Sequence, residues 1–176
     1  KEINLLKKYP KTTRDINSRK NNKALEDQKI ARKFDKEFFD GDRKTGYGGY
    51  FYNQKYWDKV VEDFIRYYNL SEDSKILDVG CAKGFMLYDF KRKLNNATLK
   101  GIDISKYAIE NSVNEVKNDL CLGNANNLPF EDNYFDLVIS ITTIHNLDNK
   151  DLSNSLKEIM RVSKKDAFIT VDAYRN

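Results

Sequence analysis

The 176-residue sequence contains one histidine, two prolines and two cysteines, Cys81 and Cys121. So few histidines and cysteines exclude a disulfide scaffold and a metal site built from several such ligands. The longest apolar run, around residues 135–144, contains Asp136 and is too short to cross a bilayer. No charged segment followed by an apolar stretch opens the chain, so no secretory signal is predicted. We therefore expect a cytoplasmic protein without metal or membrane contact.

The net charge of +4 comes from the first 33 residues, where basic residues outnumber acidic ones. A basic arm can bind nucleic-acid phosphates or anionic lipid. Here, however, lysines and arginines are interleaved with acidic residues and asparagines, which favours an ordinary solvated segment. The expected organisation is an N-terminal part, residues 1–54, with a basic arm, a helix and a glycine- and tyrosine-rich segment. Residues 55–176 form the main domain.

From residue 75 onward, short apolar runs alternate with amphipathic segments. This alternation predicts an α/β fold with a doubly wound, mostly parallel sheet and helices on both faces. Such sheets bind ligands beyond the carboxyl ends of their strands. The expected strands are residues 75–79, 98–102, 120–122, 135–141 and 167–171, and the expected helices are residues 25–39, 55–69, 85–94, 105–116 and 151–162.

The most informative motif is Asp78-Val79-Gly80-Cys81-Ala82-Lys83-Gly84, between an expected strand and an expected helix. A strand-to-helix turn uses glycine where the backbone turns tightly or approaches a ligand, and the helix then begins with free N–H groups. Nineteen residues after Gly84, Asp103 ends the next strand. A carboxylate at that place can accept hydrogen bonds from both hydroxyls of a ribose. The pattern therefore predicts a nucleoside-binding site.

The spacing distinguishes two classes of nucleoside cofactor. The nicotinamide pattern G-x-G-x-x-G, counted from Gly80, needs glycines where this chain has Ala82 and Phe85. The pattern D-x-G-x-G-x-G matches at Asp78, Gly80 and Gly84, with Ala82 at the remaining small position. An acidic residue beside the loop suits a cationic group and repels a pyrophosphate, so a positively charged nucleoside is favoured. The methyl group of Ala82 fits this loop if its φ stays negative.

Four motifs in this order resemble those of the class I S-adenosylmethionine-dependent methyltransferases. They are the glycine loop, Asp103, the segment GNANNLPF at residues 123–130 and the segment EDNYFDLV at residues 131–138. The resemblance covers about residues 55–173 and implies a Rossmann-like sheet of seven strands, of which the sequence supplies five and lacks the C-terminal sixth and seventh. It also implies S-adenosyl-L-methionine as the cofactor and S-adenosyl-L-homocysteine as its product.

The resemblance gives roles to individual residues. It implies that the Gly80–Gly84 loop wraps the methionine end of the cofactor, that Asp103 holds the ribose hydroxyls, and that Asn124 and Ala125 flank the adenine. The family usually has Asp at position 124; an Asn can still accept from the adenine amine, but it is also a common turn former. The predicted cofactor-binding residues are Asp78, Gly80, Cys81, Ala82, Gly84, Asp103, Ile104, Asn124, Ala125, Ser140 and Tyr47.

The implied reaction is a direct displacement, for which the protein mainly holds two reactants in line. His145 follows the expected 135–141 strand, and an ordinary histidine pKa of about 6.5 suits a general base; a capping or packing role is the alternative. Residues 45–57, including Tyr47, predict a lid whose aromatic faces attract the sulfonium or bind a flat acceptor. The alternative is a surface loop whose tyrosines pack on the following helix.

Three functions remain open on the sequence. The first is methyl transfer to a small molecule, which we favour. The second is nucleic-acid methylation through the basic arm, although Ser140-Ile141-Thr142-Thr143 stands where base methyltransferases carry a tetrad such as Asn-Pro-Pro-Tyr. The third is a subunit that binds the cofactor without turnover. The 167–171 strand should form a sheet edge whose unpaired backbone groups can pair with another chain, and the oligomeric state stays open.

Overall fold

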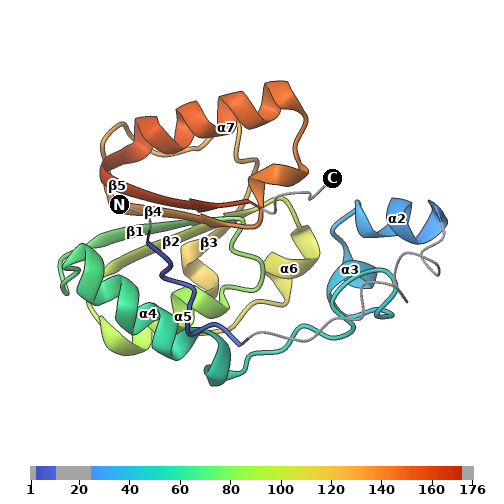
Figure 1. Ribbon diagram of the computed structural model, residues 1–176, viewed down its shortest axis with the longest axis horizontal. Coiled ribbons are helices and arrows are strands. Elements are labelled where there is room, and N and C mark those ends of the chain that lie inside the picture. Colours follow the sequence, from blue (N-terminus) through green and yellow to red (C-terminus); the bar gives the residue numbers. More distant parts are fainter. Residues whose placement is uncertain (1–2, 11–24, 172–176) are drawn as a thin grey trace.

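A computed structural model of the chain describes residues 3–10 and 25–171. Its centre is one five-stranded parallel sheet in the order β3-β2-β1-β4-β5. Helix α7 covers one face of the sheet, and helices α4 and α5 cover the other (Figure 1). The predicted doubly wound α/β fold is confirmed. The strands are β1 (Lys75–Val79), β2 (Thr98–Asp103), β3 (Leu120–Leu122), β4 (Phe135–Ile141) and β5 (Ser163–Thr170). The helices that cover the sheet are α4 (Gln54–Tyr68), α5 (Phe85–Lys93) and α7 (Asn149–Val162).

The strand order creates a crevice at the centre of the sheet. The chain starts at β1, moves outward through β2 to β3, and then returns to the other side of β1 as β4. Loops after β1 and β4 therefore leave the carboxyl edge of the sheet in opposite directions, which is where doubly wound sheets bind ligands. In Figure 1 the short helices α2 (Leu25–Ala31) and α3 (Lys36–Phe39) lie beyond this edge of the sheet.

Two apolar cores lie on the two faces of the sheet. The first includes Val61, Phe64 and Phe90 from α4 and α5, all fully buried, and Leu5 from the N-terminal residues packs into it. The second lies under α7 and includes Phe135 and Ile159. Because both faces are covered, β1 and β4 are mainly apolar, with Asp78 and Asp136 as the acidic exceptions, and their predicted limits are confirmed.

Side-chain caps explain where the longest helix on the first face begins and ends. The Asn53 side chain accepts from the Lys55 N–H at the start of α4, and Asn69 ends the helix in the left-handed conformation. Ser105 likewise caps α6 (Lys106–Glu110), where its Oγ accepts from the Ala108 N–H.

Two predicted helices differ from the structure. The helix expected over residues 25–39 is broken into α2 and α3, because Phe34 has a φ of 50° and the Asp35 carboxylate caps a new helix at the Lys36 N–H. The helix expected over residues 105–116 ends at Glu110. There Asn111 and Ser112 donate side-chain hydrogen bonds to the carbonyls of Tyr107 and Ile109, which competes with helix continuation.

One arginine fixes the long loop between β3 and β4. The Arg161 guanidinium on α7 donates to the backbone oxygens of Leu128 (2.9 Å) and Phe130 (2.8 Å) and to the carboxylates of Asp132 and Glu158. The Glu158 carboxylate in turn accepts from the Leu128 N–H at 2.7 Å. This network ties residues 128–132 to α7, and no local sequence pattern singled it out.

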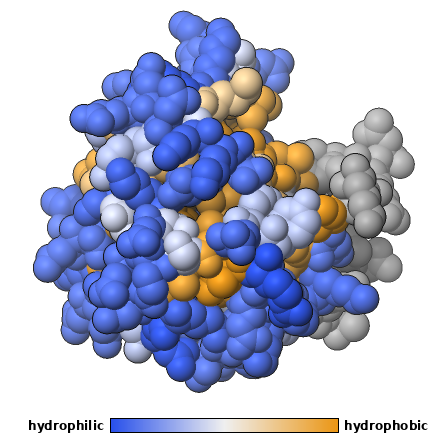
Figure 2. Space-filling model, turned by 90° about the vertical axis from the view of Figure 1, so that its left-hand side faces the viewer, coloured by the Kyte–Doolittle hydropathy of each residue, from blue (hydrophilic) through white to orange (hydrophobic). Residues whose placement is uncertain are grey.

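Strand β5 lies at the edge of the sheet, as predicted, and begins four residues earlier than expected, directly after α7. Its residues Lys164–Ala167 are exposed. Figure 2 shows one side of the molecule, where hydrophobic residues gather in the middle of a mostly hydrophilic face. Within the described ranges, no helix has the length and apolar character needed to span a membrane. Most of the basic arm, residues 11–24, lies outside the described residues.

Candidate functional site

The glycine loop after β1 has a backbone path that requires glycine at two positions. Gly80 and Gly84 have φ values of 86° and 77°, in the left-handed region that side chains disfavour. The Gly80 N–H donates to the Ile102 carbonyl on β2 at 2.8 Å. A Cβ on Gly80 would overlap the side chain of Thr143, which follows β4. The loops after β1 and β4 are therefore in direct contact at the centre of the sheet edge.

Asp103 lies against this loop, as the spacing predicted. Its carboxylate accepts from the Ala82 N–H at 2.7 Å and from the Ser105 N–H at 2.8 Å. These bonds hold both oxygens in a fixed orientation, with further lone pairs left for a ligand. Burial raises the pKa of this carboxyl, and hydrogen bonds from Ser105, Ala82 and Ile104 oppose the rise. Among the described residues, the charge of Asp103 is thus stabilised by backbone N–H groups.

Asp78 is a second buried carboxyl at the same edge of the sheet. Only 6% of its surface is exposed. Desolvation raises its pKa to about 7, and the charge of Asp103 adds to the rise. A cationic ligand group placed here would lower the pKa of Asp78 again, so the site is electrostatically prepared for positive charge.

Ala82 corrects one expectation. We made its fit to the loop conditional on a negative φ, but its φ is 49°, in the left-handed region. The loop geometry imposes this value, since the Ala82 N–H must reach Asp103 and the Gly84 N–H must reach the Cys81 carbonyl at 2.9 Å. A left-handed alanine costs about 1 to 2 kcal/mol, which the surrounding hydrogen bonds offset.

The other predicted cofactor residues of the central strands have different surroundings. The Cys81 side chain is buried in the first apolar core. Ser140, on β4, is fully buried, and its hydroxyl has no hydrogen-bond partner in the described part of the chain. Ile104 is 58% exposed directly after Asp103 and offers an apolar surface at the carboxyl edge. Their roles in cofactor binding stay predictions.

Residues after β3 and β4 complete the edge. The Asn124 side-chain oxygen accepts from the Asn126 N–H at 3.2 Å, so this residue forms a turn. The neighbouring Ala125 packs against the second apolar core. His145 is half-buried in the short 3-10 helix η2 (Ile144–Asn146), two residues after the Thr143 that contacts the glycine loop. The binding role of Asn124 and the base role of His145 stay predictions.

The glycine- and tyrosine-rich segment folds back onto the glycine loop. The rings of Tyr47 and Tyr50 are 4.4 Å apart, and Tyr50 stacks on Phe85, the first residue of α5, at 4.7 Å. Desolvation raises the pKa of the Tyr50 hydroxyl well above its usual value, and the negative charges of Asp78 and Asp103 add to it. Tyr50 therefore lies within electrostatic reach of both carboxylates.

Sequence reasoning missed the residue that attaches this segment. Lys83, inside the glycine loop, donates to the Asp40 carboxylate at 2.6 Å and to the Tyr50 carbonyl at 3.0 Å. The Tyr107 hydroxyl on α6 donates to the same Asp40 oxygen at 2.7 Å. The available signal was a lysine placed between two glycines of a turn and followed by an apolar helix.

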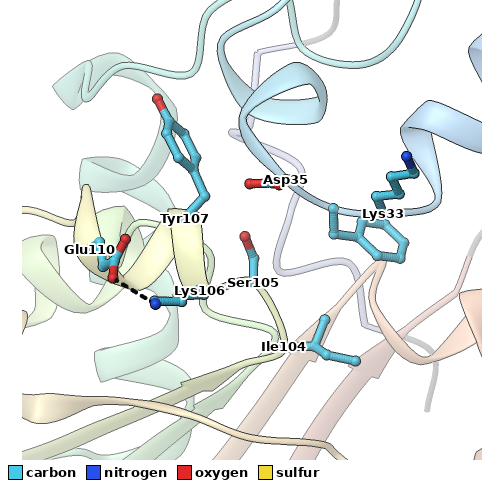
Figure 3. Close-up of a pocket in the computed structure, with 8 residues that line it drawn as sticks. Lys33, Asp35, Ile104, Ser105, Lys106, Tyr107 and Glu110 are labelled. Carbon is cyan, nitrogen blue, oxygen red and sulfur yellow. Dashed lines mark ion pairs between the residues drawn. The ribbon is translucent and has the colours of Figure 1, made fainter.

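A cavity of about 370 Å³ lies between α6 and the turn joining α2 to α3. In Figure 3, Asp35 lies opposite Ser105, and Lys106 forms an ion pair with Glu110 on the rim (Nζ–Oε1 3.6 Å). Ile104 lines its floor. Its lining includes Ile104 and Ser105, the two residues that follow β2.

Comparison with known proteins agrees with this geometry. Residues 77–171 match the methyltransferase-domain family. The chain is 33% identical over 106 residues to the mitochondrial arginine-hydroxylase NDUFAF5 of Rattus norvegicus, covering 57% of this chain and 29% of that protein. It is 32% identical over 126 residues to the demethylmenaquinone methyltransferase of Symbiobacterium thermophilum, covering 66% of this chain and 49% of that protein.

Among solved structures, the chain is similar to a SAM-dependent methyltransferase from Methanosarcina mazei, with 29% identity and a TM-score of 0.51. That match covers 57% of this chain and 52% of the solved chain. The chain thus spans about half the length, or less, of these relatives. The predicted cofactor, S-adenosylmethionine, is confirmed at the level of the family. This chain belongs to the methyltransferase-domain family of S-adenosylmethionine-dependent enzymes.

Proposed function

We propose that this protein transfers the methyl group of S-adenosylmethionine to a small-molecule acceptor. The observation that carries the proposal is the junction of Asp103 with the glycine loop at the switch point of the sheet. The loop supplies a tight backbone turn at which glycine is required, since the Thr143 side chain packs where a Cβ on Gly80 would lie. Asp103 supplies a carboxylate held by two backbone N–H groups.

These residues fit a cationic nucleoside. The Asp103 oxygens can accept from ribose hydroxyls in addition to their backbone partners. Asp78 supplies a buried carboxyl beside the loop, which favours a positive group over a phosphate. Gly84, at the N-cap position of α5, has no side chain to cap the helix, so the first N–H groups of α5 face the loop as donors for a carboxylate.

When bound, S-adenosylmethionine supplies a methyl group activated by a sulfonium sulfur, which a nucleophile of the acceptor displaces. The work of the chain is then to hold the reactants together and to exclude water. Tyr50 and Tyr47 cover the loop with aromatic surface that attracts a cation. We propose His145, which follows β4, as the base that takes the proton of an acceptor hydroxyl or amine.

A small, flat acceptor fits the surroundings of the loop better than a polymer. Phe39, Tyr47, Tyr50 and Tyr107 form one aromatic cluster over the site, with neighbouring ring centres between 4.4 and 6.4 Å apart. The demethylmenaquinone methyltransferase among the relatives is named for an aromatic quinone-type substrate, which supports the same class. The nucleic-acid alternative depends on the basic arm, most of which lies outside the described residues.

The deciding experiment is a calorimetric titration with S-adenosylhomocysteine, with NADH as the control ligand. We expect micromolar binding by the wild-type chain and at least a tenfold weaker affinity for Asp103→Asn, because each hydrogen bond to a charged group contributes about 1.5 to 3 kcal/mol. The matched control is Asp136→Asn. The Asp136 carboxylate also accepts a backbone N–H, from Lys75 at 3.0 Å, at the opposite end of the sheet.

Several outcomes would contradict the proposal. Absence of binding by the folded wild-type chain, or tighter binding of NADH, rejects the cofactor assignment. An equal loss of affinity in both variants rejects the role of Asp103. Cofactor binding without conversion of S-adenosylmethionine in an acceptor screen supports the non-catalytic subunit. A relative is named as a hydroxylase, so the screen must detect S-adenosylhomocysteine itself.

A further inference from the structure

Lys83 closes a ring of hydrogen bonds between the glycine loop and the tyrosine-rich segment. Its Nζ donates to Asp40 Oδ2 and to the Tyr50 carbonyl, while the Tyr50 N–H donates to Asp40 Oδ1 at 2.9 Å. Both backbone polar groups of Tyr50 are thereby bound. The Lys83 and Asp40 side chains are only 5% and 15% exposed, so this ion pair is shielded from solvent.

A third segment also binds the Asp40 carboxylate. The Tyr107 hydroxyl, from α6, donates to the same carboxylate oxygen as Lys83, and its ring lies 5.6 Å from the Lys83 ammonium. The Asp40 carboxylate thus joins three segments that are far apart in the sequence. Replacing Lys83 by an apolar residue would leave a mostly buried carboxylate without its cation, which is strongly unfavourable.

A second polar anchor lies just beyond Tyr50. The Tyr52 hydroxyl donates to the buried Asp89 carboxylate of α5 at 2.6 Å, and Arg92 donates to both groups at 3.0 Å. Tyr50 therefore lies between two points of attachment, and its ring stacks on Phe85 at the first turn of α5. The backbone that carries its ring, which lies against Phe85 directly after the glycine loop, is therefore fixed from both sides.

We propose that Lys83 is a positioning residue which, through Asp40 and the backbone of Tyr50, holds the Tyr50 ring over the cofactor loop and so sets cofactor affinity. The inference rests on the proposed function and goes beyond it. Lys83 acts here without touching the cofactor. If the tyrosine-rich segment is attached to the glycine loop in nearly all molecules, the cofactor has little left to order when it binds. If the segment is attached in only a tenth of the molecules, the apparent affinity for the cofactor falls tenfold.

The test is a set of titrations of the whole chain with S-adenosylhomocysteine. We expect Lys83→Met to weaken binding at least tenfold and Lys83→Arg, which keeps the charge and several donors, to stay within about threefold of wild type. Lys93→Met is the matched control. Lys93 also forms a mostly buried ion pair, with Asp58 at 2.9 Å, but at the far end of α5. The Lys93→Met variant should therefore bind S-adenosylhomocysteine with wild-type affinity.

A double-mutant cycle separates positioning from a general loss of structure. If Lys83 acts through the ring of Tyr50, the Tyr50→Ala variant already lacks that contribution, and adding Lys83→Met should cause no further loss of affinity. Trypsin gives a ligand-free measurement, because Arg43 and Lys44 are exposed in the attached segment. Cleavage there should be several-fold faster in Lys83→Met than in wild type or Lys93→Met.

The outcomes distinguish this inference from the proposed function. No binding by the wild-type chain overturns both. Wild-type binding with unchanged affinity in Lys83→Met, or additive losses in the double variant, overturns the positioning role alone. If Lys83→Met does not fold, Asp40→Asn takes its place, with the same expected loss and the same cycle with Tyr50→Ala. Unchanged affinity in that variant overturns the inference equally.

Discussion

Replacing Ala82 by glycine should stabilise the protein, which is unusual for a glycine substitution. Ala82 has a φ of 49°, and an L-residue in this region costs about 1 to 2 kcal/mol. Glycine removes this cost, but it adds about 0.4 to 1 kcal/mol of unfolded-state entropy. Loss of a half-buried methyl group costs about 0.4 kcal/mol more. The net gain is about 0.5 kcal/mol, or a Tm increase of roughly 1 to 2 °C for a chain of this size.

The control is Ala108→Gly. Ala108 is fully buried in the middle of α6 and has no positive φ. Glycine there costs about 1 kcal/mol of helix propensity and about 0.8 kcal/mol of burial, so Tm should fall by roughly 4 to 7 °C. Calorimetry or thermal circular dichroism gives both values. A fall in Tm for Ala82→Gly comparable to that of Ala108→Gly would refute a left-handed Ala82.

Three further predictions concern pH, the loop before β4 and turnover. Asp78 has a folded-state pKa of about 7, above its unfolded value, so its contribution to stability is lost as the pH rises toward 7. The free energy of unfolding of Asp78→Asn, measured with urea, should therefore gain about 2 to 3 kcal/mol on that of wild type between pH 5 and pH 8. A constant difference between the two proteins would contradict the raised pKa. Arg161→Lys should lower the free energy of unfolding by about 1 to 3 kcal/mol, because an ammonium cannot reach all the acceptors of the guanidinium. The control Arg66→Lys, in an exposed pair with Asp63, should change the free energy of unfolding by less than about 0.5 kcal/mol. His145→Gln should lower kcat by about 10² to 10⁴ with unchanged S-adenosylhomocysteine affinity, and an intact turnover and pH profile would exclude the base role.

Three strands could be predicted from the sequence because each is a mainly apolar segment bounded by polar residues. Residues 75–79, 120–122 and 135–141 were predicted with the limits that the structure has. Hydrophobic periodicity was less informative for residues 25–39, where the helical spacing of apolar residues continues across a break in the helix. Leu25, Ile30, Phe34 and Phe38 fall near one helical face, yet the helix breaks at Phe34. Phe38 instead packs edge-on against Tyr47, a residue whose approach no local pattern specifies.

Some residues of the candidate site could likewise be predicted from the sequence, and others could not. Gly80 and Asp103 were found from the sequence because their spacing follows from one strand-turn-helix unit and the next strand. Asp40 and Lys83 were not found, because their contact joins residues 43 positions apart. The condition of a negative φ at Ala82 is not met. Residue type alone favours a negative value, whereas the hydrogen bond from its N–H to Asp103 accompanies a positive one.

The sequence by itself thus determined the class of fold and the family, and it predicted the edge of the sheet for cofactor binding. These depend on hydrophobic periodicity and on short motifs, which act over a few residues. Only the tertiary structure decided how the tyrosine-rich segment is attached, which carboxylates lie together and how the glycine loop is held. Those features depend on contacts between distant parts of the chain, whose geometry exists only once the sheet has brought its loops to one edge.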